Sequence, residues 1–222
     1  MKKAVKTLSA LIALCALIAC NPVESQFADI LQEDAILINS SLKGSEVHDI
    51  EKTIVSRVNN ATRSSELISD AEAKSLFTPL VEDGKKIKEQ ISRLADVGSL
   101  KMTTVDREYL DDLDEVSLAG LSYEMFTIME ALNVKEIQIV QESSLEKATV
   151  KKDENTESRF WPCLKEAFGF KVIGEVKAYV NGTKALVSAS ELWPIIKAAG
   201  TRWLGWAGLI YSVYQFVDCI SE

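Results

Sequence analysis

Residues 118–132 read LAGLSYEMFTIMEAL, and apolar side chains recur along this stretch at alternating steps of three and four residues. The positions that make up the pattern are Leu118, Leu121, Met125, Ile128 and Leu132. Such steps bring all of these side chains to one face of an α-helix. The stretch therefore predicts a helix with one apolar face.

The same spacing occurs in the segments that precede this stretch. It is seen at Phe27, Ile30, Leu31, Ala35 and Ile38, at Val47, Ile50, Ile54 and Val58, and at Leu80, Ile87, Ile91 and Leu94. Ser45 and Asp70 are expected to cap the second and third helices, and Pro79 to bend or interrupt the third. Amphipathic helices of this kind pack around a shared core, so residues 26–150 are predicted to form an acidic helical bundle. Residues 136–141 (EIQIVQ) alternate as a strand does, but the stretch is too short to decide.

The last part of the chain has a different composition. All four tryptophans and six of the ten glycines lie in residues 161–222, where six basic residues accompany five acidic ones. Residues 20–160 instead hold 16 basic and 28 acidic residues. The stretch 151–159 is polar, as a linker would be. The predicted fold is therefore all-α, with the bundle joined by this linker to a small hydrophobic helical unit at 160–222.

Residues 202–220 are predicted to form the central helix of that unit, because they are apolar nearly all round. The fifteen uncharged residues from 203 to 217 fall short of the roughly 20 that a bilayer-spanning helix needs. Small residues at Gly205, Gly208 and Ser212 favour a close helix neighbour, for which residues 183–199 are the best candidate.

A surface for a partner or ligand is predicted at the tryptophans of this unit. Trp193 precedes Pro194, which is expected to kink its helix and leave a concave spot. We expect Trp193, Trp203 and Trp206 to form this surface.

The N-terminal stretch, MKKAVKTLSALIALCALIAC, has a basic start followed by a short apolar run, as secretory signal peptides do. Its end, Leu17-Ile18-Ala19-Cys20, resembles the lipobox of bacterial lipoprotein signal peptides. The resemblance implies that residues 1–19 are removed and that Cys20 carries fatty-acyl chains such as palmitate. Residues 20–25 would then be a lipidated tether. An ordinary signal peptide and a buried apolar helix are the alternatives.

The resemblance places the protein in the cell envelope, with the membrane as its partner through the lipid anchor. Asn21 is not the aspartate that retains lipoproteins at the inner membrane of some two-membrane bacteria. The expected location is therefore the outer membrane, if the host has one.

Cys163 and Cys219 bracket the hydrophobic unit, and they are the only cysteines that follow Cys20. Outside the cytoplasm such a pair is expected to form a disulfide. We therefore predict a Cys163–Cys219 disulfide that closes the unit.

The residue types exclude several classes of function. The net charge of −8 disfavours a nucleic-acid partner, which calls for clustered positive charge. His48 is the one histidine, and the carboxylate-rich stretch 106–115 lacks the glycine and glutamate spacing of an EF-hand loop. We therefore predict no catalytic, cofactor-binding or metal site, and no cofactor.

Three functions remain open on the sequence. The first is a non-enzymatic lipoprotein that binds or scaffolds an envelope protein or a small ligand. The second is a membrane-active protein, antibacterial or pore-forming, that acts through its C-terminal unit. The third is an enzyme whose site the sequence does not locate.

Overall fold

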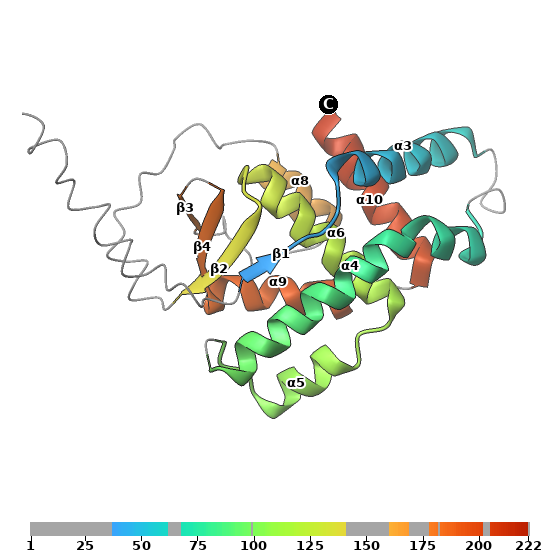
Figure 1. Cartoon of the computed structure of the whole chain (residues 1–222). Helices are drawn as coiled ribbons and strands as arrows, with labels where there is room; N and C mark the ends of the chain where they lie inside the picture. Colours follow the sequence, from blue (N-terminus) through green and yellow to red (C-terminus); the bar gives the residue numbers. More distant parts are fainter. Residues whose placement is uncertain are drawn as a thin grey trace, which may run out of the picture.

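The computed structural model describes residues 37–61, 68–98, 100–140, 160–168, 178–181, 183–201 and 205–221. Within these ranges the elements are β1 (Leu37–Asn39), α3 (Gly44–Asn60), α4 (Asp70–Asp96), α5 (Thr104–Asp111), α6 (Glu115–Ala131), β2 (Glu136–Val140), α8 (Phe160–Phe168), β3 (Ala178–Asn181), β4 (Lys184–Ser188), α9 (Ala189–Thr201) and α10 (Gly205–Ser221). The predicted predominantly helical fold is confirmed, and a small sheet accompanies the helices (Figure 1). The signal peptide with Cys20, the tether, the linker at 151–159 and Trp203 lie outside the described residues.

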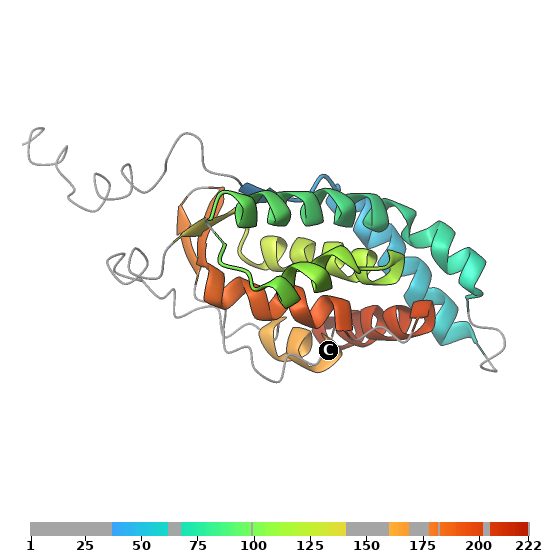
Figure 2. The ribbon, with the colours of Figure 1, turned by 90° about the horizontal axis from the view of Figure 1, so that it is seen from below.

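Helix α6 lies at the centre of the molecule, between α4 on one side and α9 and α10 on the other (Figure 2). It begins after Asp114, whose side chain accepts a hydrogen bond of 2.8 Å from the Ser117 N–H. Every residue from Val116 to Met129 is buried except Phe126, which is half-buried. The predicted apolar face is therefore buried, and the opposite face is buried as well.

Helices α4 and α6 come into backbone contact at Gly84. This glycine is buried in α4, and a Cβ at its position would lie 2.7 Å from the carbonyl carbon of Leu118 in α6. No side chain larger than hydrogen fits between the two helices at this point. The pair can therefore cross closely only because position 84 is glycine.

A buried carboxylate lies directly beside this crossing. Asp83 is 1% exposed and accepts a hydrogen bond of 2.8 Å from the Ser122 hydroxyl of α6. It also accepts bonds from the Ser40 hydroxyl and from the Ser41 hydroxyl and N–H, at 2.6–2.8 Å. One side chain thus joins α4, α6 and the segment that follows β1.

The helix ends differ slightly from the prediction. Helix α4 is capped by Ser69 rather than Asp70, because Ser69 and Glu72 bond each other's backbone N–H groups in a capping box. Helix α3 begins one residue before the predicted cap Ser45, at Gly44. Pro79 does not interrupt α4, which continues to Asp96 and changes direction in its first half (Figure 2).

The four strands form one sheet in the order β1-β2-β4-β3. Strand β2 runs antiparallel to β1 and parallel to β4, and β3 and β4 form an antiparallel pair. Ile137 of β2 stands opposite Ile38 on one side and Ala185 on the other, and all three side chains are buried. The sheet therefore joins three parts of the chain that are far apart in sequence.

The sheet corrects two predicted helices. Residues 37–39, which lie within the first predicted helix, form β1, and residues 184–188, which lie near the start of the predicted helix 183–199, form β4. Both segments pair with β2, which is the stretch whose alternation the sequence left undecided. Pairing with a distant strand outweighs the local helical spacing in both cases.

One hydrophobic core runs through the described residues, from Ile38 in β1 to Phe216 in α10. Helix α10 packs against α8 and α3, and α9 packs against α6. The neighbour predicted for α10 was the helix at 183–199, but its principal contacts are with α8 and α3. The core is therefore continuous across the boundary predicted from charge.

We expect Gly84→Ala to destabilise the protein by about 3 kcal/mol, because the added methyl group forces α4 and α6 apart. Gly44→Ala is the matched control, since its nearest atom is Phe126 Cζ at 3.9 Å and alanine favours a helix. Urea denaturation followed by circular dichroism measures both. A urea midpoint of Gly84→Ala equal to that of the wild type would contradict the close contact between α4 and α6 at this position.

Candidate functional site

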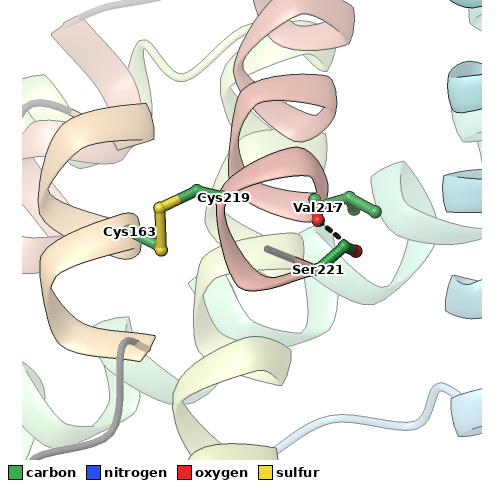
Figure 3. The surroundings of a disulfide bond; sticks show 4 residues. All are labelled: Cys163, Val217, Cys219 and Ser221. Carbon is green, nitrogen blue, oxygen red and sulfur yellow. Dashed lines mark hydrogen bonds between the residues drawn. A yellow bond between two sulfur atoms is a disulfide. The ribbon is translucent and has the colours of Figure 1, made fainter.

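The disulfide predicted from sequence is confirmed. Cys163 of α8 is bonded to Cys219 of α10, with 5.6 Å between their Cα atoms (Figure 3). Cys163 is buried, and Ser221, two residues beyond Cys219, donates a hydrogen bond of 2.6 Å to the Val217 carbonyl. The bond attaches α8 to the last helix of the chain.

Aromatic side chains fill the space between α6, α8 and α10. The ring centroid of Tyr123 lies 5.7 Å from that of Phe168 and 6.2 Å from that of Phe216. Phe160 packs edge-to-face on Phe216 at 5.5 Å. These rings form a closed aromatic core beside the disulfide rather than an open pocket.

The hydroxyl group of Tyr123 forms a hydrogen bond at the edge of this aromatic core. Its hydroxyl donates a hydrogen bond of 2.7 Å to Glu51 of α3. Burial raises the pKa of Glu51 above its ordinary value of 4.5, while Tyr123 and His48 oppose that rise. Burial and the nearby Glu51 carboxylate raise the pKa of Tyr123 well above 10.0. The Tyr123 hydroxyl therefore keeps its proton, and its hydrogen bond to Glu51 joins α6 to α3.

His48 and Asp49, neighbours in sequence, act separately. The His48 Nδ1 lies 2.7 Å from the Gly44 carbonyl oxygen, and Asp49 forms an ion pair with Lys52 at 3.9 Å. Both side chains are exposed. The contacts of this histidine are thus within its own helix.

Helix α5 is held on α9 by polar contacts to Lys197. Asp106 forms an ion pair with Lys197, and Tyr109 donates a hydrogen bond of 2.7 Å to the Lys197 carbonyl. The Lys197 ammonium and hydrogen bonds from Thr103 hold the pKa of Asp106 far below its ordinary value. Asp106 belongs to the carboxylate-rich stretch, and its role here is to cap α5 and attach it to α9.

The three tryptophans predicted to form a surface have different positions. Trp193 is half-buried in α9, its ring lies 5.5 Å from the Lys197 ammonium, and its buried N–H makes no hydrogen bond. Trp206 is 9% exposed and stacks on Phe77 of α4 at 5.7 Å, so its place is in the core. Trp203 lies outside the described residues.

A hollow that the sequence reasoning missed lies along α4. It has a volume of about 560 Å³ and is lined by Lys85, Lys88, Glu89, Ser92, Arg93 and Leu118. All but Leu118 come from one stretch of α4, KKIKEQISR at residues 85–93, where four basic residues accompany one acidic residue. The signal was present in the sequence as a basic run in an acidic chain.

Two further observations concern the described residues alone. They contain no cluster of three or more histidine, cysteine, aspartate or glutamate side chains that could hold a metal ion. None of their helices has the length and apolar character needed to cross a membrane.

Comparison of the chain with models of protein families, with curated proteins and with solved structures gave no significant match.

We expect loss of the disulfide through Cys163→Ser to cost about 2–5 kcal/mol, because the bond closes a long loop in the unfolded chain. Urea denaturation of the oxidised protein and of the variant measures this loss. Alkylation of the native protein without reductant, followed by mass spectrometry, is expected to modify neither cysteine. Modification of both would contradict the bond in the cellular protein.

The Glu51–Tyr123 pair predicts a pH dependence of stability. The pKa of Glu51 is higher in the folded chain than in the unfolded one, so the folded state holds its proton more strongly. Its contribution is present below pH 4.5 and is lost as pH rises through the raised pKa. We therefore expect Glu51→Gln, which keeps an acceptor for Tyr123, to become more stable relative to the wild type as pH rises. Denaturation between pH 4 and 8 measures this; a difference that is constant or falls would contradict it.

Proposed function

We propose that this protein is a lipid-anchored lipoprotein of the bacterial cell envelope, whose helical domain binds or scaffolds a partner without catalysing a reaction. The anchor is Cys20, at the end of the lipobox-like sequence Leu17-Ile18-Ala19-Cys20. If the host has an outer membrane, that membrane is the proposed location.

The observation that carries the proposal is the disulfide between Cys163 and Cys219. Disulfides persist in oxidising compartments such as the periplasm and the cell surface. A disulfide inside the folded domain therefore supports export, which is what the N-terminal signal requires. Two independent parts of the chain thus favour the same compartment.

A binding role, rather than a catalytic one, is supported by the positions of three polar side chains that contact other elements of the fold. Asp83, Asp106 and Tyr123 each bond groups on neighbouring elements and so hold the fold together. The half-buried Trp193 beside Lys197 is the proposed contact for an envelope protein or small ligand.

The same arrangement favours binding over the membrane-active alternative. Trp206, Leu209, Ile210, Val213 and Phe216 of α10 are buried in the core. Acting on lipid through α10 would require these side chains to leave their packing against α3, α4, α6 and α8. Release of dye from liposomes by the oxidised protein would replace the binding proposal with the membrane-active one.

We expect Cys20→Ser to move the protein from the membrane fraction to the soluble fraction of the cell, because no acyl chains can be attached. Cys15→Ser is the matched control and should leave the protein in the membrane fraction, since Cys15 stands within the apolar run of the signal. Mass spectrometry of the native N-terminus should find an acylated Cys20. An unmodified N-terminus at another residue would overturn the anchor.

A pull-down from the native envelope with the lipidated protein then tests the binding role. We expect Trp193→Ala to lose the captured partner while retaining membrane attachment, with Tyr211→Ala, an exposed aromatic of α10, as the control.

A further inference from the structure

We propose that the hollow on α4 is a binding site for a phosphate-bearing anion, supplied either by an anionic lipid headgroup or by a soluble phosphate compound. This inference rests on the geometry of the hollow and is independent of the lipid anchor and of the Trp193 contact.

The position of the cations is the first argument. Lys85, Lys88 and Ser92 recur at steps of three and four residues along α4, so they share one face of the helix, and Arg93 follows directly. Leu118 of α6 completes the lining. The volume of about 560 Å³ lies in the range of small-molecule sites and exceeds that of a single phosphate.

The partners of these cations are the second argument. The Lys88 ammonium donates a hydrogen bond of 2.8 Å to the backbone carbonyl of Asp111, at the end of α5. The Arg93 Nε donates to the backbone carbonyl of Glu89 at 3.4 Å. Among the described residues no carboxylate lies within 4.0 Å of the Lys88 or Arg93 charge. Both cations are therefore oriented by neutral oxygens, and neither is held in a direct ion pair within the described residues.

The other charged side chains at the hollow determine how much positive charge remains there. Lys85 is paired with Glu82 at 2.7 Å, and Glu89 is the one carboxylate that lines the hollow. The formal balance of these five groups is one positive charge, in a chain whose net charge is −8. Glu115 also acts on Lys85, but it is itself paired with Lys74 at 2.7 Å. Positive charge collected in a hollow attracts an anion despite the opposite overall charge.

A phosphate group fits these donors better than a carboxylate does. Its three free oxygens can accept hydrogen bonds from the Lys88 ammonium, the Arg93 guanidinium and the Ser92 hydroxyl together. The space beyond the phosphate, toward Leu118, suits the carbon skeleton of a glycerol or sugar attached to it.

The test uses residues 21–222, which retain every residue of the described core and the disulfide but cannot be lipidated. One arm titrates inorganic phosphate, and then glycerol phosphate, at constant ionic strength by calorimetry. The other arm measures sedimentation with phosphatidylcholine vesicles that contain phosphatidylglycerol, against vesicles of phosphatidylcholine alone. Binding in the first arm identifies a soluble phosphate compound, and binding only to the phosphatidylglycerol vesicles identifies a lipid headgroup.

Three variants decide whether this hollow is responsible. We expect the double variant Lys88→Gln with Arg93→Gln to weaken binding at least about tenfold, because two charged hydrogen-bond donors are lost. The double variant Lys52→Gln with Arg57→Gln removes the same charge from exposed positions on α3 and should change binding by less than about twofold. Glu89→Gln removes the opposing carboxylate and should tighten binding by about threefold.

Glu89→Gln tests the site even if the variant with both cations replaced folds poorly, because weaker or unchanged binding would contradict it. No binding of phosphate, glycerol phosphate or phosphatidylglycerol vesicles to the wild type would overturn the site. An equal loss in both double variants would overturn it as well, because the effect would then follow net charge rather than the hollow.

Discussion

The backbone contact between α4 and α6 at Gly84 determines how the rest of the chain must fold. With no side chain at this position, the backbone of α4 rests on the Leu118 carbonyl group of α6. This brings α6 so deep that every residue from Val116 to Met129 is buried except the half-buried Phe126. Because α4 covers only one side, other elements must cover the rest, and α9 and α10 from the end of the chain do so. The C-terminal segment is therefore part of the same core.

The polar groups at this crossing determine where the chain enters the domain. Asp83 precedes Gly84, so it is buried by the same helix contact and must find partners inside the protein. Ser122 comes from α6, and Ser40 and Ser41 come from the segment after β1. These bonds hold that segment against α4 in an extended form and place β1 beside β2. Pairing with β2 and a carboxylate more than forty residues away thus act together on the strand at residues 37–39.

Local periodicity in the sequence was enough to locate α3, α4 and α6, but not α5 or the sheet. The apolar stripes of α3, α4 and α6 are buried except for the partly buried Val58 and Leu132, because helical spacing is a local property. Strand β1 has three residues and pairs with Ile137 and its neighbours about a hundred residues later, so no local pattern reports it. The sequence did not predict that the second face of α6 is buried, because that face carries polar residues, which usually mark an exposed surface. These are Ser117, Ser122 and Glu124. The disulfide was predictable because only two cysteines follow Cys20, whereas the hollow depends on a helix crossing that the sequence does not reveal.

The hollow and the fold depend on the same contact. Leu118, whose carbonyl group meets Gly84, also lines the hollow, and Lys85 follows Gly84 directly in α4. The cation of Lys88 is oriented by the carbonyl of Asp111, which lies at the end of α5, and α5 is held on α9 through Asp106 and Lys197. The position of that carbonyl is therefore set by contacts remote from the hollow. A change that separates α4 from α6 would remove Leu118 from the hollow, and one that separates α5 from α9 would displace the Asp111 carbonyl that orients Lys88, even though every basic residue of α4 was kept. The ability to bind an anion here would thus be a property of the assembled helices rather than of the basic run alone.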